Sequence, residues 1–142
     1  MKILKNNEID GMQWQELLDS SPTKSFFQSK TCYDFYTQLS FLTPFAIAVA
    51  ENDKLQALVC GYIVAEGGKI KQYFSRRAII PAGILLANKV NEKYIVQLLA
   101  ELNIHLERKA IYTEIRNYRW SRPRGGRRDP GTSWRYRAAA AS

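Results

Sequence analysis

The sequence predicts a single α+β domain in which a mixed, mostly antiparallel sheet is flanked by helices. Residues 11–22 and 88–109 carry apolar side chains at helical spacing, and residues 44–74 have the pattern of strands joined by tight turns. Residues 110–117 return to strand character directly after the second of these helical stretches. Because almost no loop separates them, this last strand is expected to fold back beside the others.

Three segments have the periodicity of amphipathic helices, and each is expected to bury one apolar face. They are residues 11–20, which Pro22 follows, residues 31–41 and residues 88–109. The side chains expected on the buried faces are Trp14, Leu17 and Leu18 in the first, Cys32, Phe35, Tyr36 and Leu39 in the second, and Ile95, Leu98, Leu99, Leu102 and Leu106 in the third.

A β-hairpin is predicted after the second helix. PFAIAVA has β character, and Asn52 and Asp53 tolerate the positive φ angles of a tight turn. LQALVCGYIVA is apolar on both alternating faces, which predicts a central strand covered on both sides. KIKQYFS is expected to return as a third strand. In RRAIIPAGILLAN, Pro81 and Gly83 interrupt the strand character of the isoleucines and leave the assignment open.

The positive charge is concentrated at the carboxyl end. Of the net charge of +8, residues 1–121 supply +3 and residues 122–142 supply +5. The domain is therefore assigned to residues 1–121, and residues 122–142 to a non-native or disordered tail that resembles translated cloning-site sequence. The alternative is a basic arm that binds RNA, in which Trp134 and Tyr136 stack on bases between arginines.

Composition and motifs exclude several classes of protein. No apolar run reaches the ~18 residues of a membrane helix and no signal peptide is recognisable, so the default location is the cytoplasm. Cys32 and Cys60 lie far apart without a CxxC motif, which indicates buried thiols rather than a metal site. His105 is assigned to a helix surface. No phosphate-binding glycine motif is present, and no cofactor is predicted.

The strand at residues 110–117 contains the first candidate site. Tyr112, Glu114 and Arg116 share one face at spacings of ~7 Å, and the opposite face, formed by Ile111, Thr113 and Ile115, is expected in the core. The polar face has two interpretations. Glu114 and Arg116 either clamp a polar ligand, or they form a solvated ion pair worth ~0 to 1 kcal/mol.

Two adjacent arginines form the second candidate site. Arg76 and Arg77 precede the loop that contains Gly83, where guanidinium groups and backbone amides could hold a carboxylate or a phosphate. The spacing of the glycines does not fit the turn with which acetyl-coenzyme A binding proteins hold their cofactor.

Three segments together resemble a known family. SFFQS at 25–29, FSRRAII at 74–80 and IYTEIRN at 111–117 are similar to the beginning of the Fem-type peptidoglycan aminoacyltransferases, over about residues 10–121. The resemblance implies one lobe similar to the Gcn5-related N-acetyltransferase fold, the first of two in that family. Family members transfer an amino acid from aminoacyl-tRNA to an amine of a cell-wall precursor, so the chain is expected to be a truncated transferase that is inactive alone.

The same resemblance implies roles for the candidate residues. Arg116 and Asn117 would face the groove between the lobes, and Arg76, Arg77, Tyr112 and Glu114 would join them in binding substrate. No general base is identified, and no lysine corresponds to the one that contributes to precursor binding in some family members. Two alternatives stay open: a small basic nucleic-acid-binding module, and an inactive structural fragment that self-associates through its exposed sheet edge and apolar surface.

Overall fold

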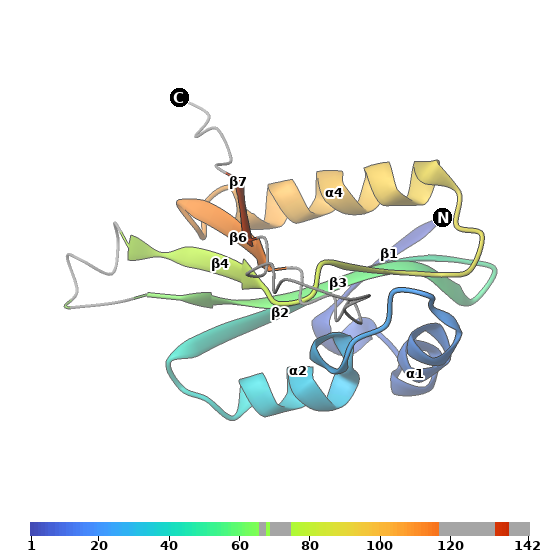
Figure 1. The fold of residues 1–142 in the computed structure, drawn as a ribbon, viewed down its shortest axis with the longest axis horizontal. Coiled ribbons are helices and arrows are strands. Elements are labelled where there is room, and N and C mark those ends of the chain that lie inside the picture. The colour runs from blue at the N-terminus through green and yellow to red at the C-terminus, as the bar shows by residue number, and fades with distance from the viewer. Residues whose placement is uncertain (66–67, 69–74, 117–132, 137–142) are drawn as a thin grey trace, which may run out of the picture.

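One sheet lies between two helical layers, with α1 and α2 on one face and α4 on the other (Figure 1). The computed structural model describes residues 1–65, 68 and 75–116, together with the backbone of residues 133–136. Within these residues the sheet has seven strands in the order β1-β2-β3-β4-β6-β7, and β5 also pairs with β3. β4 and β6 run parallel, and the other pairings are antiparallel. The α+β class predicted from the sequence is confirmed.

The elements have the following bounds. The strands are β1 Lys2–Lys5, β2 Leu42–Glu51, β3 Lys54–Val64, β4 Arg77–Ile80, β5 Ile84–Leu86, β6 Tyr112–Arg116 and β7 Ser133–Tyr136. The α-helices are α1 Gly11–Ser20, α2 Lys30–Thr37 and α4 Glu92–Leu106, and the short 3-10 helices are η1 Asn6–Glu8 and η2 Phe26–Gln28. Most of the predicted third strand, KIKQYFS, lies outside the described residues.

The predicted hairpin and central strand are confirmed. Asn52 and Asp53 adopt φ angles of 51° and 58°, as a tight two-residue turn between β2 and β3 requires. Alternate residues of β3 enter two separate clusters. Leu58 packs with Trp14 of α1 on one face, and Val59 packs with Leu98 of α4 on the other. Each face of the sheet is therefore covered by its own hydrophobic core.

The edge strand β1 was not predicted, because its four residues carry no clear pattern. Asn6 ends it with a φ angle of 52°, a conformation that asparagine adopts more readily than most residues. Its side-chain Oδ1 accepts a hydrogen bond from the backbone N–H of Ala46 at 2.9 Å. Asn6 thus turns the chain away from the sheet edge and still satisfies a donor of β2.

α1 and α2 cover one face of the sheet. Asp10 caps α1 by accepting from the N–H groups of Met12 and Gln13, and the predicted core residue Trp14 is fully buried. α2 ends at Thr37, four residues earlier than the predicted segment. The assignment of Phe35 to the buried face is wrong, since this side chain is 59% exposed and Tyr33 is buried instead.

α4 covers the other face of the sheet. Asn91 caps it by accepting from the N–H of Lys93, so the helix begins several residues after the start of the predicted stretch. Leu98, Leu102 and Leu106 are buried as expected. Leu99 is 43% exposed, which corrects the predicted stripe, and Tyr94 is buried in the core beneath α4.

Residues 76–88 form two strands separated by a short interruption. β4 and β5 both pair with β3, and Pro81 to Gly83 lie between them. Gly83 has a φ angle of 74°, which a side chain would strain. Gly61 of β3 lies opposite the end of β4, and a Cβ atom there would overlap the carbonyl oxygen of Ile79. The glycine therefore allows β4 and β3 to approach closely.

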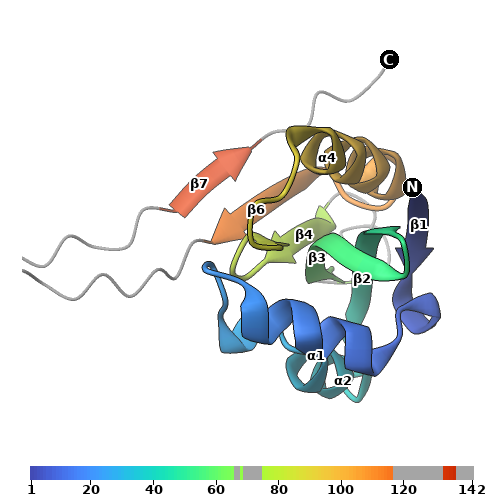
Figure 2. The same cartoon turned by 90° about the vertical axis from the view of Figure 1, so that its right-hand side faces the viewer.

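β6 lies beside β4, as its position after α4 predicts. Thr113 is buried and Ile115 packs partly against the core beneath α4. Ile111 precedes the strand and is 42% exposed, so its assignment to the core is wrong. Four residues of the segment 122–142 form β7 beside β6, and the rest of that segment lies outside the described residues (Figure 2). None of the described helices is long and apolar enough to cross a membrane.

Candidate functional site

Glu114 and Arg116 form an ion pair on one face of β6. The Nε–H of Arg116 donates to Oε1 of Glu114 at 2.9 Å, and the two side chains are 33% and 13% exposed. Because Glu114 is largely removed from water, this pair is not a fully solvated surface pair. The hydrogen bond fixes the orientation of the Arg116 guanidinium relative to the Glu114 carboxylate.

The other predicted residues lie at the opposite end of β6. Arg77 is the cross-strand partner of Tyr112, and the N–H of Ile111 donates to the carbonyl oxygen of Arg76 at 2.8 Å. Tyr112 and Arg116 are four positions apart, which corresponds to ~13 Å along a strand. Register thus brings Arg77 to Tyr112 but keeps both away from Arg116. Asn117 lies outside the described residues.

Arg76 and Arg77 differ in their surroundings, although both are partly exposed. Arg77 is the first residue of β4 and pairs with Tyr112, so its side chain shares the face of Tyr112 and Glu114. Arg76 precedes the strand. The Nε atoms of both arginines are buried. Joint binding of an anion by Arg76 and Arg77 stays a prediction.

The segment 25–29 is fixed to the sheet by three contacts. The indole Nε1–H of Trp14 donates to the carbonyl oxygen of Gln28 at 2.8 Å, and Nε2 of Gln28 donates to the carbonyl oxygen of Ala82 at 3.1 Å. The thiol of Cys60 lies 3.6 Å from the carbonyl oxygen of Phe27. These contacts hold the segment against α1, β3 and the interruption between β4 and β5.

Gln28 makes two of these three contacts. In the sequence, only the family resemblance of SFFQS pointed to this residue. Its side chain is 1% exposed, and Oε1 is a buried acceptor for which the described residues provide no hydrogen-bond donor. The sequence offers no further signal for Gln28, because the carbonyl group to which its side chain donates belongs to Ala82, 54 residues away. Phe26 beside it is 65% exposed.

Segment 25–29 and the Arg116 end of β6 lie at the same end of the sheet. Ile80 pairs with Ile115, and Ala82, to which Gln28 donates, follows Ile80 by two residues. In Figure 2 the turn before α2 and the carboxyl end of β6 point to the same side of the molecule. The structure therefore groups the two most family-like segments, SFFQS and IYTEIRN. Ligands of open sheets commonly bind at the carboxyl ends of parallel strands.

Burial favours the protonated forms of the Cys60 thiol and the Tyr36 phenol. Burial raises the pKa of the Cys60 thiol to about 12, with a further contribution from Cys32. Burial also raises the pKa of Tyr36, whose ring packs 4.8 Å from that of Tyr62. Cys32 and Cys60 are both buried free cysteines, which confirms the prediction for them. The raised pKa of Cys60 makes this thiol a poor nucleophile.

The described residues contain no group of three His, Cys, Asp or Glu side chains that could hold a metal ion.

Comparison with solved structures relates the fold of this chain to a known one. The chain aligns with the crystal structure of FemX at a TM-score of 0.60, covering 82% of this chain and 27% of the FemX chain. The fold is similar to that of FemX. At 18% identity the similarity concerns the fold alone, and the chain spans about a quarter of the FemX chain. The Fem-like fold that the motifs implied is thereby confirmed.

No protein-family model matches the sequence. No curated protein matches it either.

Proposed function

We propose that the chain is the amino-terminal lobe of a Fem-type acyl- or aminoacyltransferase, with the character of a Gcn5-related N-acetyltransferase lobe. The observation that carries the proposal is the alignment of 82% of the chain with about a quarter of FemX. The proposed reaction transfers an acyl or aminoacyl group to an amine of a cell-wall precursor in the cytoplasm. The lobe alone is proposed to be inactive, because the rest of the FemX chain has no counterpart in it.

The carboxyl end of β6 is proposed to bind substrate. Arg116 would pair with an anionic part of the precursor or the donor, while Glu114 fixes its guanidinium through the 2.9 Å hydrogen bond. Asn117 is proposed to contribute the next polar contact. Arg77 and Tyr112 lie ~13 Å away along the strand and would contact a distant part of the same extended substrate, together with Arg76.

This arrangement suits acyl transfer between two large substrates. Attack of an amine on a carbonyl requires alignment of both groups and donors for the developing oxyanion. The arginines of the proposed site and segment 25–29, which Gln28 holds in place, would align the amine with the carbonyl group. Aminoacyl-tRNA or another acyl donor would bind with the participation of the second lobe, and the proposal assigns no general base to this chain.

Calorimetry with a cell-wall precursor tests the proposal on a chain that includes the second lobe. Arg116→Ala is expected to weaken binding about tenfold or more, because it removes a charge-assisted hydrogen bond from a partly buried site. Lys54→Ala is the matched control, since it removes one exposed positive charge at the β2–β3 turn. Equal affinity of the wild type and Arg116→Ala would contradict the proposed role of Arg116.

A further inference from the structure

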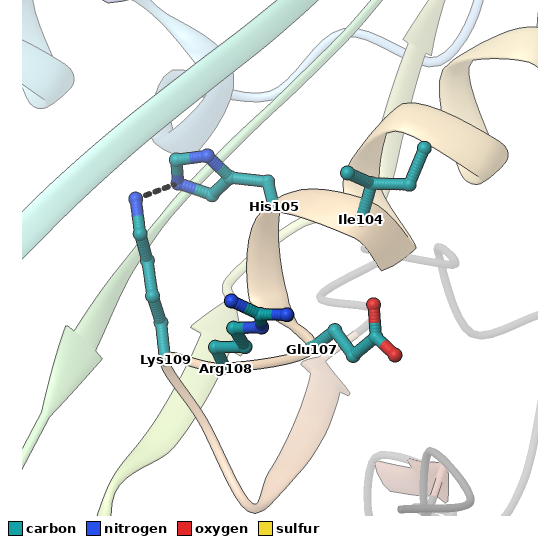
Figure 3. A pocket seen from close by; sticks show the side chains of 5 residues that line it. All are labelled: Ile104, His105, Glu107, Arg108 and Lys109. Carbon is teal, nitrogen blue, oxygen red and sulfur yellow. Dashed lines mark hydrogen bonds between the residues drawn. The ribbon is translucent and has the colours of Figure 1, made fainter. Parts of the chain in front are cut away.

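A hollow of about 400 Å³ lies at the carboxyl end of α4 (Figure 3). Its lining side chains are Ile104, His105, Glu107, Arg108 and Lys109. The size is within the range of small-molecule sites, which is ~300 to 1,000 Å³. We call it the α4 hollow. It adjoins the start of β6 and is therefore separate from the Arg116 end of that strand.

His105 forms a fixed wall of the α4 hollow. Its ring packs against the ring of Phe45 from β2, with 5.6 Å between the centroids. Its Nε2 lies 3.5 Å from Nζ of Lys109. An ammonium group can only donate, so Nε2 is the acceptor and Nδ1 carries the proton of the neutral ring. Burial lowers the pKa of His105, and the charges of Lys109 and Lys5 lower it further.

The positive charges around His105 are incompletely neutralised. Lys5 is paired with Glu101 at 3.2 Å. Arg108 and Lys109, in contrast, have no carboxylate within 4 Å in the part of the chain that the structure describes. Glu107 also lines the hollow, but in Figure 3 its carboxylate points away from the Lys109 ammonium. Two cations and a histidine thus share one concavity.

We propose that the α4 hollow binds a small molecule through a phosphate or carboxylate group. The guanidinium of Arg108 matches the planar, two-pronged geometry of such anions, and Lys109 supplies a second charge that can move. A bound anion would offset the repulsion between Lys109 and protonated His105. The apolar surface of Ile104, which is 62% exposed, offers contact to the remainder of the ligand.

His105 allows the proposal to be tested directly, because it is the single histidine of the sequence. Its imidazole resonances are followed by proton NMR while sodium phosphate, pyrophosphate or citrate is added, with sodium chloride adjusting every sample to one ionic strength. Binding is expected to shift the resonances saturably and to move their titration midpoint to higher pH. A response to the phosphates alone, to citrate alone or to both identifies the anionic group. No saturable response to any of them overturns the proposal.

Matched variants separate a specific site from general charge attraction. Arg108→Gln and Lys109→Gln are each expected to weaken the saturable response about tenfold, the loss of one charge-assisted contact. Lys54→Gln removes an exposed positive charge near the other end of α4 and is expected to leave the response unchanged. Equal weakening in all three variants would overturn the proposal. Thermal unfolding of each variant verifies that all remain folded, and none of these results bears on Arg116.

Discussion

The indole Nε1–H of Trp14 donates to the carbonyl oxygen of Gln28 at 2.8 Å, between residues that are 0% and 1% exposed. The side chain of Gln28 continues this connection to the carbonyl oxygen of Ala82. Helix α1, segment 25–29 and the β4–β5 interruption are therefore coupled through one glutamine. The candidate site depends on residues that are too deeply buried to touch substrate.

Gln28→Glu is expected to destabilise the protein by about 3 kcal/mol or more at neutral pH, because it places an unpaired carboxylate in the core. Burial would raise the pKa of this carboxyl in the folded state above its unfolded value. At low pH the neutral carboxyl can donate to the carbonyl oxygen of Ala82, so the variant should be most stable there. Its free energy of unfolding should fall as pH rises and the carboxyl ionises. Urea unfolding across the acidic and neutral range measures this trend.

Gln38→Glu is the control for this substitution, since Gln38 is exposed just after α2. It is expected to change the free energy of unfolding by less than about 0.5 kcal/mol. If Gln28→Glu changed the free energy of unfolding as little as the control does, this result would contradict the burial of Gln28.

Gly61→Ala is expected to destabilise the protein by about 3 kcal/mol, because its Cβ would overlap the carbonyl oxygen of Ile79 and force β3 and β4 apart. Gly11→Ala provides the comparison. Beyond its neighbours along α1, no atom of the described residues lies within 4 Å of a Cβ at Gly11, the first residue of that helix. Alanine there is expected to stabilise by about 0.5 kcal/mol. Chemical unfolding of both variants gives the difference, and similar values for the two would contradict the close approach.

Local patterns were sufficient to predict the main elements. Asn52 and Asp53 identified the hairpin turn, and the alternation in residues 111–116 identified β6 with its buried Thr113. These features depend on neighbours in sequence. β1 and β5 are short strands without a pattern of their own, and pairing with β2 and β3 creates them.

The arrangement of the candidate residues could not be predicted, because register is not a local property. The sequence assigned Arg77 and Arg116 to two candidate sites for one substrate, and the pairing of Arg77 with Tyr112 places these arginines at opposite ends of β6. The exposure of Phe35 depends on how α2 lies on the sheet, which helical spacing alone does not determine. The hydrogen bond from Gln28 to Ala82 could not be predicted, because the two residues are 54 positions apart in the sequence.

His105 makes the stability of the protein depend on pH. Its pKa is lowered in the folded state, so the unfolded chain binds this proton more tightly. The contribution of His105 is complete above its unfolded pKa of about 6.5 and is lost as pH falls toward the folded value. Relative to His105→Gln, the wild type should lose stability over this range in buffers without phosphate or carboxylates. Parallel unfolding curves for the two proteins at all these pH values would contradict the burial of the ring.

β7 is expected to stabilise β6 although it belongs to the segment 122–142. It pairs with Thr113 to Arg116 along four residues and covers an edge that would otherwise expose unpaired backbone groups. A chain ending at Ser121 should therefore unfold at lower urea concentration. It should also self-associate more readily, because the uncovered edge of β6 can pair with a second copy. Unfolding curves and sedimentation velocity at several protein concentrations measure both effects.

Filter binding with the same two proteins distinguishes this structural role from that of an RNA-binding arm. If the arginines of residues 122–142 neutralise phosphates, the full chain should bind RNA with a steep dependence on salt, and removal of the segment should abolish that slope. If the segment serves mainly as a strand, its removal should change stability and association while neither protein binds RNA. Unchanged stability without β7 would contradict the structural role, because a paired edge strand cannot be removed without losing its backbone hydrogen bonds.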